Sequence, residues 1–440
     1  MTTDAQGLAL SAGEETAPLL DQAIYDYFAW RGDPVGTLAS ATEADPGFTL
    51  GHAAIASLML LGGVPGTNAD IRARLDTAAA LPANAREQAH VAAAEAFAAG
   101  AMVKATDIWE AILIDYPTDA LALRFAHDSY FYLGHSLSIR DSIARVLDQW
   151  DRDDPLHGFI LGQYAFGLEE AGDLAKAEAM GRAALARNAE DAWAVHAVAH
   201  VLEMTSRQAE GIAFLRETRP DWSKGIWLSV HNGWHLALYL IEAGRGQEVL
   251  ADYDAHVAPK IGGDSLLDLV DASSLLWRLE LAGVDVGPRW QAIAAQWLSH
   301  VDDHVLAFND LHIAMAAARA GRDDDVAALR RSLDAYQSGD GVADNRAITL
   351  DVGRSVIEGV LSHAAGDHAG AVRHLLPCRY KWIRIGGSHA QRDLLSQTLI
   401  DAAEKSGQHR LAHALWAERA GWRPTMPVLE RYAAARRRLT

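Results

Sequence analysis

The sequence predicts an all-α protein, built as a right-handed superhelical solenoid of helical hairpins. Apolar segments of helical length stop repeatedly at a glycine, and an Ala-rich second segment follows each stop. The alternation of β-branched and polar residues that marks strands is nearly absent. Half of the 440 residues are hydrophobic, which is enough to build a large core.

The expected turns recur at intervals of 34 to 45 residues, the range of helical hairpin repeats. Glycine suits this position because the residue that ends such a helix adopts a left-handed conformation. The turns are expected at Gly62, Gly100, Gly134, Gly172, Ser206, Gly244, Gly283, Gly321, Gly366 and Gly407.

The best-formed repeat covers residues 161–185. Leu161-Gly162, Tyr164, Gly172 and Ala177 stand where tetratricopeptide repeats place Leu-Gly, Tyr, Gly and Ala. We therefore expect tetratricopeptide-like hairpins in one continuous domain over residues 16–440. Residues 1–15 are expected to be disordered.

Composition and charge restrict the functional class. The net charge of −19 disfavours binding to nucleic acid and to anionic membrane surfaces. No apolar run is long enough to span a membrane, and the N-terminus lacks a secretory signal, so we expect a cytoplasmic protein. The single cysteine, Cys378, is expected to be structural.

Polar residues recur at a similar distance before successive turns, which predicts a shared inner surface. His235, Ser274 and His312 each lie nine residues before a turn glycine. His196 and His200, like His231 and His235, are spaced i, i+4 on one helical stripe. The candidate catalytic residues are His196, His200, Glu203, His231, His235, Asp271, Asp310 and His312.

A second set of residues is expected to bind substrate. Tryptophans would form the pocket wall, and Arg278 and Arg392 would clamp an anionic group. The segment around Ser388 fits either an anion-binding helix terminus or an ordinary N-cap. The substrate-binding candidates are Trp193, Trp234, Ser274, Trp277, Arg278, His389, Gln391, Arg392 and Asp393.

Histidines on apolar helices have other interpretations. A lone histidine of this kind is usually a hydrogen-bonded core residue, and we interpret His127, His135 and His363 in this way. The two histidine pairs with Glu203 could instead hold a metal ion, but no known metal motif is matched. We therefore predict neither a resident metal nor an organic cofactor.

The sequence resembles the tetratricopeptide repeat protein 38 family from about residue 20 onward. The similar segments are residues 130–134, 164–170, 191–196, 200–204, 231–239, 271–279, 308–312 and 386–393. One departure is Gly233 in the His231-Asn-Gly-Trp-His235 run, where the family usually carries a bulkier residue. The resemblance implies a helical-repeat fold and brings no established reaction.

Two functional hypotheses follow. The first is a concave pocket that binds a polar small molecule and performs acid–base chemistry of the hydrolase or lyase type. The alternative is a non-enzymatic adaptor whose groove binds a peptide or protein partner. The groove's His, Trp and Asp content favours the first, and a homodimer stays open in both.

Overall fold

The computed structural model describes residues 2–263, 265–340 and 343–439, and it is all-helical apart from one two-residue strand pair. The strands β1 (Thr2–Thr3) and β2 (Ala9–Leu10) pair antiparallel. None of the helices in the described ranges is long and apolar enough to cross a membrane.

Contacts within the chain group it into two compact units, and the single domain expected from the sequence stays a prediction. Unit 1 comprises residues up to 198, together with 220–229 and the described part of 340–345. Unit 2 comprises 199–219, 230–339 and 346 onward.

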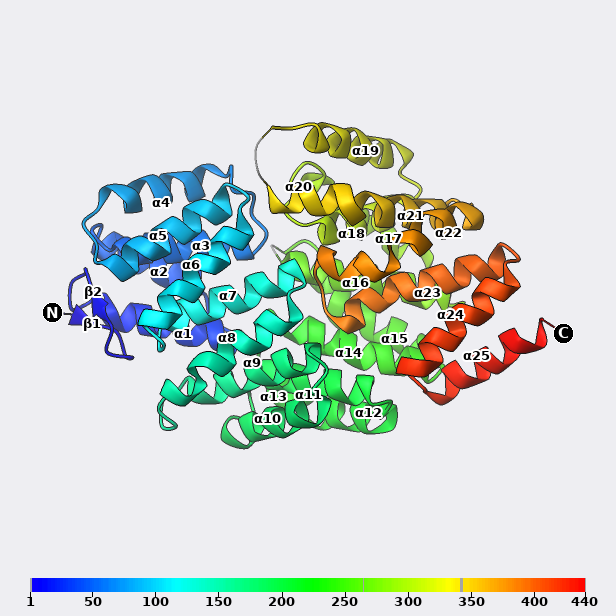
Figure 1. The fold of residues 1–440 in the computed structure, drawn as a ribbon, viewed down its shortest axis with the longest axis horizontal. Helices are drawn as coiled ribbons and strands as arrows, with labels where there is room; N and C mark the ends of the chain where they lie inside the picture. The colour runs from blue at the N-terminus through cyan, green and yellow to red at the C-terminus, as the bar shows by residue number, and fades with distance from the viewer. Residues whose placement is uncertain (1, 264, 341–342, 440) are drawn as a thin grey trace. The chain divides into compact units, whose positions relative to one another are not determined.

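The first half of the chain contains helices α1 (Ala17–Ala29), α2 (Pro34–Ala44), α3 (Thr49–Leu61), α4 (Ala69–Ala80), α5 (Ala85–Ala98), α6 (Met102–Asp115), α7 (Ala120–Leu133), α8 (Ser136–Val146), α9 (His157–Glu170), α10 (Leu174–Arg187), α11 (Ala192–Met204), α12 (Gln208–Glu217) and α13 (Arg219–Trp222). Within unit 1, consecutive helices from α7 to α10 pack side by side (Figure 1).

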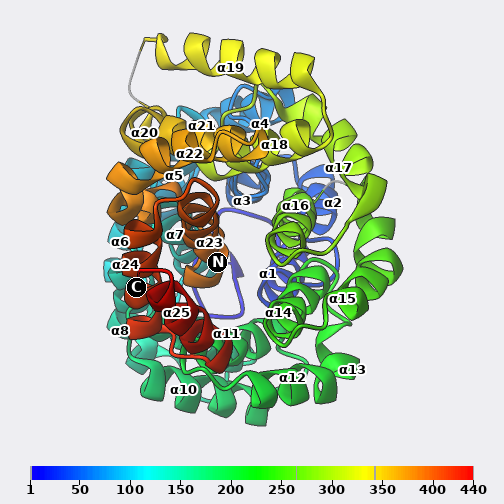
Figure 2. The same ribbon diagram turned by 90° about the vertical axis from the view of Figure 1, so that its right-hand side faces the viewer.

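The second half contains α14 (Ser229–Glu242), α15 (Gly246–Asp252), α16 (Leu266–Leu281), α17 (Trp290–Trp297), α18 (Ala307–Arg319), α19 (Asp323–Gln337), α20 (Asp344–Ile348), α21 (Arg354–Ala364), α22 (His368–Leu375), α23 (His389–Lys405), α24 (His409–Trp422) and α25 (Met426–Arg437). Within unit 2, α24 packs against both α23 and α25 (Figure 2).

The expected turns are confirmed almost to the residue. From Gly100 to Gly407, each expected turn residue has a positive φ, between 60° and 86°, and follows the end of a helix. Ser206 adopts the left-handed conformation, with φ of 60°, where the other turns of this series use glycine. The first turn is corrected by one residue, because Gly62 is right-handed and Gly63 has φ of 88°.

Residues 1–15 are the segment expected to be disordered; Met1 lies outside the described residues, and several of the others make polar contacts with the rest of unit 1. Asp4 accepts a hydrogen bond from the backbone N–H of Leu8 and lies 3.6 Å from the buried guanidinium of Arg86. The Arg86 side chain also donates to the carbonyl of Ala9. These polar contacts connect a segment whose composition carries no helical pattern to Arg86 on α5.

Several helices are buried on all sides, which places polar side chains in the interior. In α16, every residue from Asp268 to Leu279 is buried, and in α9 every residue from Gly162 to Glu170 is buried. A helix that is apolar all round is typical of a protein core. Polar groups on such helices need internal partners, because burying them without a hydrogen bond is costly.

Candidate functional site

In unit 2, two side chains of α14 contact side chains of α16 that lie 40 residues later in the chain. The Nδ1 atom of His231 lies 2.9 and 3.0 Å from the two carboxylate oxygens of Asp271. One turn further along, the indole Nε1–H of Trp234 donates to the Ser274 hydroxyl at 2.8 Å. The structure thus brings together four residues that the sequence placed in one functional surface.

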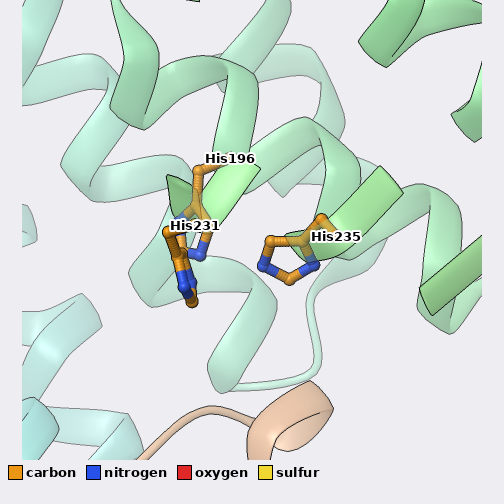
Figure 3. A group of neighbouring side chains, drawn as sticks. All are labelled: His196, His231 and His235. Carbon is orange, nitrogen blue, oxygen red and sulfur yellow. The ribbon is translucent and has the colours of Figure 1, made fainter. Parts of the chain in front are cut away.

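His231 and His235 lie one turn apart on α14, and their rings meet edge to face with centroids 5.0 Å apart (Figure 3). The ring of His200 lies 4.5 Å from that of His235. Burial, together with the neighbouring His200 and His231, holds the pKa of His235 well below its usual value. His235 is therefore a neutral imidazole at physiological pH.

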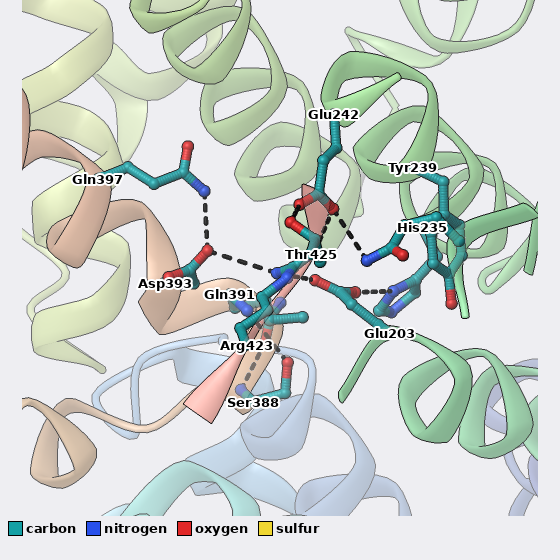
Figure 4. A network of polar contacts seen from close by, with 12 residues as sticks. Glu203, His235, Tyr239, Glu242, Ser388, Gln391, Asp393, Gln397, Arg423 and Thr425 are labelled. Carbon is teal, nitrogen blue, oxygen red and sulfur yellow. Dashed lines mark hydrogen bonds and ion pairs between the residues drawn. The ribbon is translucent and has the colours of Figure 1, made fainter. Parts of the chain in front are cut away.

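A network of charged side chains extends from His235 (Figure 4). His235 Nδ1 lies 3.6 Å from one oxygen of Glu203, whose other oxygen accepts from Arg423 at 2.7 Å. Arg423 also pairs with Glu242 at 2.9 Å and lies 3.6 Å from Asp393. The network thus links α11, α14, α23 and the segment after α24.

Asp393 is the centre of the second half of this network. It pairs with Arg419 through both oxygens, and Gln397 donates to it at 2.8 Å. Burial alone would raise the pKa of Asp393, but Arg419 and Arg423 lower it well below the usual value. Likewise, burial would lower the pKa of Arg423, and its carboxylate partners outweigh this effect and raise it.

A cavity of about 140 Å³ opens beside this network within unit 2. Its wall carries charges of both signs, from Glu203, Glu242, Asp393, Arg419 and Arg423. The apolar part includes Leu238, Ile241, Leu281, Ile400 and Trp416. A cavity of similar volume in another protein admits a ligand the size of benzene.

Arg278 lines the same cavity and is only 2% exposed. Its guanidinium donates to the Ser274 hydroxyl at 2.9 Å and to the carbonyls of Ala390 and Gln391 at 2.7 and 3.1 Å. No carboxylate in the described part of the chain forms an ion pair with it, and burial lowers its pKa to about 10. Arg278 is thus a buried cation whose direct partners are neutral.

The start of α23 is an N-cap. The Ser388 hydroxyl accepts from the Gln391 backbone, and the Gln391 side chain accepts from the Ser388 backbone, in a capping box. Arg392 donates to the carbonyl of Gly387. The polar groups of Gln391 and Arg392 therefore hold the turn, while the first residue of the helix, His389, is partly buried.

Three further sequence candidates on unit 2, Asp310, His312 and Trp277, also lie outside the His235–Arg423 network. Asp310 pairs with His304 at 3.1 Å, a partner that the sequence analysis did not single out. His312 bonds to the carbonyl of Phe308 at 2.7 Å, and burial lowers its pKa to about 4. Trp277 donates to the Thr398 hydroxyl at 2.9 Å.

The remaining candidates, Trp193 and His196, belong to unit 1. The two rings are 4.6 Å apart, and His196 also packs on Phe166 at 5.2 Å. Together with Phe166, they form an aromatic core of unit 1.

Close to this aromatic core lies a polar group that sequence reasoning missed. The Arg124 guanidinium lies 4.7 Å from the ring centroids of both Tyr27 and Trp30, and its Nε donates to Asp128 at 3.0 Å. The i, i+4 spacing of Arg124 and Asp128 on an apolar helix was the available signal. Among the described residues, the atoms left without a hydrogen-bond partner include Nη1 and Nη2 of Arg124, both ring nitrogens of His127, and both amide atoms of Gln163.

Sequence reasoning also missed Arg419, Arg423 and Glu242 in unit 2. Arg419 and Arg423 are spaced i, i+4 near the end of α24. In a sequence, such a pair of arginines is typical of a solvent-exposed helix end. No protein-family model matches this chain. The resemblance to the tetratricopeptide repeat protein 38 family therefore stays a prediction.

Proposed function

We propose that unit 2 binds a small polar molecule carrying a carboxylate in the cavity beside Arg278. The observation that carries this proposal is the buried guanidinium of Arg278, which lines the cavity and has only neutral direct partners. A buried cation is stabilised by an anionic partner. A carboxylate in the cavity would supply one, and charge-assisted hydrogen bonds to arginine are among the stronger ones.

The other residues of the cavity wall further restrict the chemistry of the ligand. The cavity exposes carboxylates as well as guanidinium groups, so the ligand is expected to carry a donor group besides its carboxylate. Its volume suits a molecule of about the size of an amino acid.

The proposal extends to acid–base chemistry, of hydrolase or lyase type, with Glu203 as the reacting group. Glu203 lines the cavity and is bracketed by Arg423 and the neutral His235. A carboxylate next to an imidazole base can pass a proton to or from a bound molecule. With a ligand identified, Glu203→Gln is expected to be less stable, because Arg423 loses one carboxylate partner, and its folded fraction is expected to bind the ligand without turnover. Turnover by the folded variant at the parent rate would contradict this role.

Binding is tested by screening small carboxylates and amino acids for thermal stabilisation of the full chain, followed by calorimetric titration. Arg278→Gln keeps donors for the α23 carbonyls and removes the charge, so ligand affinity is expected to fall at least about tenfold. Arg330→Gln, an exposed arginine of the same unit paired with Glu358, is the control and should bind normally.

A second pair of variants guards against misfolding of Arg278→Gln. Ala282 is exposed and lines the cavity. Ala282→Asp adds a negative charge there and is expected to weaken carboxylate binding several-fold relative to Ala282→Asn. Equal affinities in this pair, with folded Arg278→Gln binding like the parent, would overturn the proposal. If no small carboxylate binds and a defined protein partner binds stoichiometrically, the adaptor alternative replaces it.

We also propose that the hairpins stack as a right-handed, tetratricopeptide-like solenoid. The regularly spaced left-handed turns and the packing of consecutive helices within each unit support it. An experimental structure in which the hairpins stack out of sequence order would contradict it.

A further inference from the structure

Three potential metal ligands converge at the turn between α21 and α22, in unit 2. His363 lies near the end of α21, His368 is the first residue of α22, and Asp401 projects from α23. One donor atom from each residue lies within 4.8 Å of the donor atoms of the other two. His363 was expected from the sequence to be a core residue, and its position beside His368 and Asp401 is seen only in the structure.

The hydrogen bonds leave donor atoms available in this group. His363 Nε2 lies 2.6 Å from Asp401 Oδ2, and the Lys405 ammonium also binds this oxygen, at 2.8 Å. The Nδ1 atoms of His363 and His368 are buried, and neither has a hydrogen-bond partner among the residues that the structure describes. Buried polar atoms without a partner are rare and require an explanation such as a bound ion.

The chemistry of the donor set also suits a cation. Imidazole nitrogens and a carboxylate oxygen are the ligand atoms that such an ion takes in proteins, and an ion that binds them displaces any proton they carry.

We propose that His363, His368 and Asp401 bind a divalent transition-metal ion of the zinc type. Two imidazoles and one carboxylate are a donor set that zinc and cobalt accept, with a fourth position left for water. Ligand atoms sharing an ion at about 2.0–2.2 Å lie at most about 4.4 Å apart. The ligand atoms must therefore move closer together when the ion binds. The side chain of His368 is only partly buried, so it can make this movement.

The surroundings support a built site. The ring of Trp277 packs on His363 with centroids 5.3 Å apart, and His363 and His368 are 5.1 Å apart. Lys405 is half exposed and can swing away into solvent when an ion replaces it on Asp401. This proposal does not depend on the proposed function of the cavity.

The test is a titration of the full-length, chelator-treated protein with Co²⁺, followed by visible absorption and by calorimetry. The parent is expected to bind one Co²⁺ with ligand-field bands that His368→Ala and Asp401→Asn lose, with affinity at least about tenfold weaker. His374→Ala, an exposed histidine on the same helix, is the matched control and should behave as the parent.

Lys405→Ala separates this site from general histidine binding. Because it removes the ammonium that competes for Asp401, it is expected to tighten Co²⁺ binding several-fold. Folded His368→Ala and Asp401→Asn proteins that bind Co²⁺ like the parent would overturn the proposal. So would a parent protein that shows no band and no binding heat.

Discussion

Each unit contains a buried arginine, and the two arginines have different kinds of partner. In unit 2, Arg423 contacts Glu203, Glu242 and Asp393, so positive and negative charges are interleaved. In unit 1, Arg124 has Asp128 on one side and aromatic ring faces on the others. Ring faces attract a cation but accept few hydrogen bonds, which leaves Nη1 and Nη2 of Arg124 without partners among the described residues.

The difference predicts how each interior responds to the loss of one group. An interleaved network fails when one charge is removed, because its partners stay buried and uncompensated. An interior that already contains polar atoms without partners loses little when one of them is replaced by an apolar group.

The largest expected effect is that of Asp393→Asn in unit 2. The substitution keeps the shape of the side chain but leaves Arg419 and Arg423 buried with one carboxylate fewer. We expect a loss of about 3–5 kcal/mol of stability, measured as a lower urea midpoint by circular dichroism.

The control is Asp334→Asn, which removes an exposed partner of Arg354 and should cost less than about 1 kcal/mol. If both variants shifted the midpoint equally, the network would not be the stabilising feature of unit 2.

The repeat pattern of the fold was predictable, because it depends on local rules. Glycine spacing located the turns, including the one at Ser206, since helix ends are set by nearby residues. The same spacing put His231 and Asp271 at a similar depth, and the structure pairs them, whereas Ser274 pairs with Trp234 and not with His235, which has the same spacing. The contacts of the N-terminal segment were not predictable, because no local pattern reveals that Ala9 accepts hydrogen bonds from Asn84 and Arg86.

The charged partners were not predictable in this way. Glu203 and Arg423 are 220 residues apart, and no periodicity connects positions so distant. Helices such as α9 and α16 are buried on all sides, so their apolar residues do not mark one face. The sequence pattern of such a helix does not show which neighbouring helix each polar residue contacts. The sequence therefore predicted a ligand-binding role for Arg392, which caps a turn. It did not identify Arg419 and Arg423 as candidates.

A second prediction concerns the pH dependence of unit 1. Asp191 caps α11 through hydrogen bonds from the backbone of Trp193 and Ala194, and burial raises the pKa of its carboxyl to about 7. Between the unfolded value near 4 and pH 7, the folded state then binds the extra proton, so stability falls as pH rises. Asp191→Asn should remove about 1–3 kcal/mol of this fall.

The measurement is the urea midpoint of parent and variant at pH 5 and pH 8. Asp173→Asn is the matched control, because Asp173 caps α10 from an exposed position. A pH profile of Asp191→Asn that parallels the parent would show that this carboxyl is ionised in both states.

The smallest expected effect is that of His127→Leu in unit 1. His127 is fully buried between Phe166 and Trp193, and burial lowers its pKa to about 3. Because neither ring nitrogen has a hydrogen-bond partner within the described residues, an apolar side chain of similar volume should change stability by less than about 1 kcal/mol or increase it.

The same variant also tests where the ligand binds. If the cavity beside Arg278 is the complete site, His127→Leu should bind small carboxylates with the affinity of the parent. If the folded variant lost this binding, the atoms without partners in unit 1 would be ligand contacts. The two interiors would then differ in function. The charges of unit 2 would stabilise the fold, whereas the polar groups of unit 1 would bind a ligand.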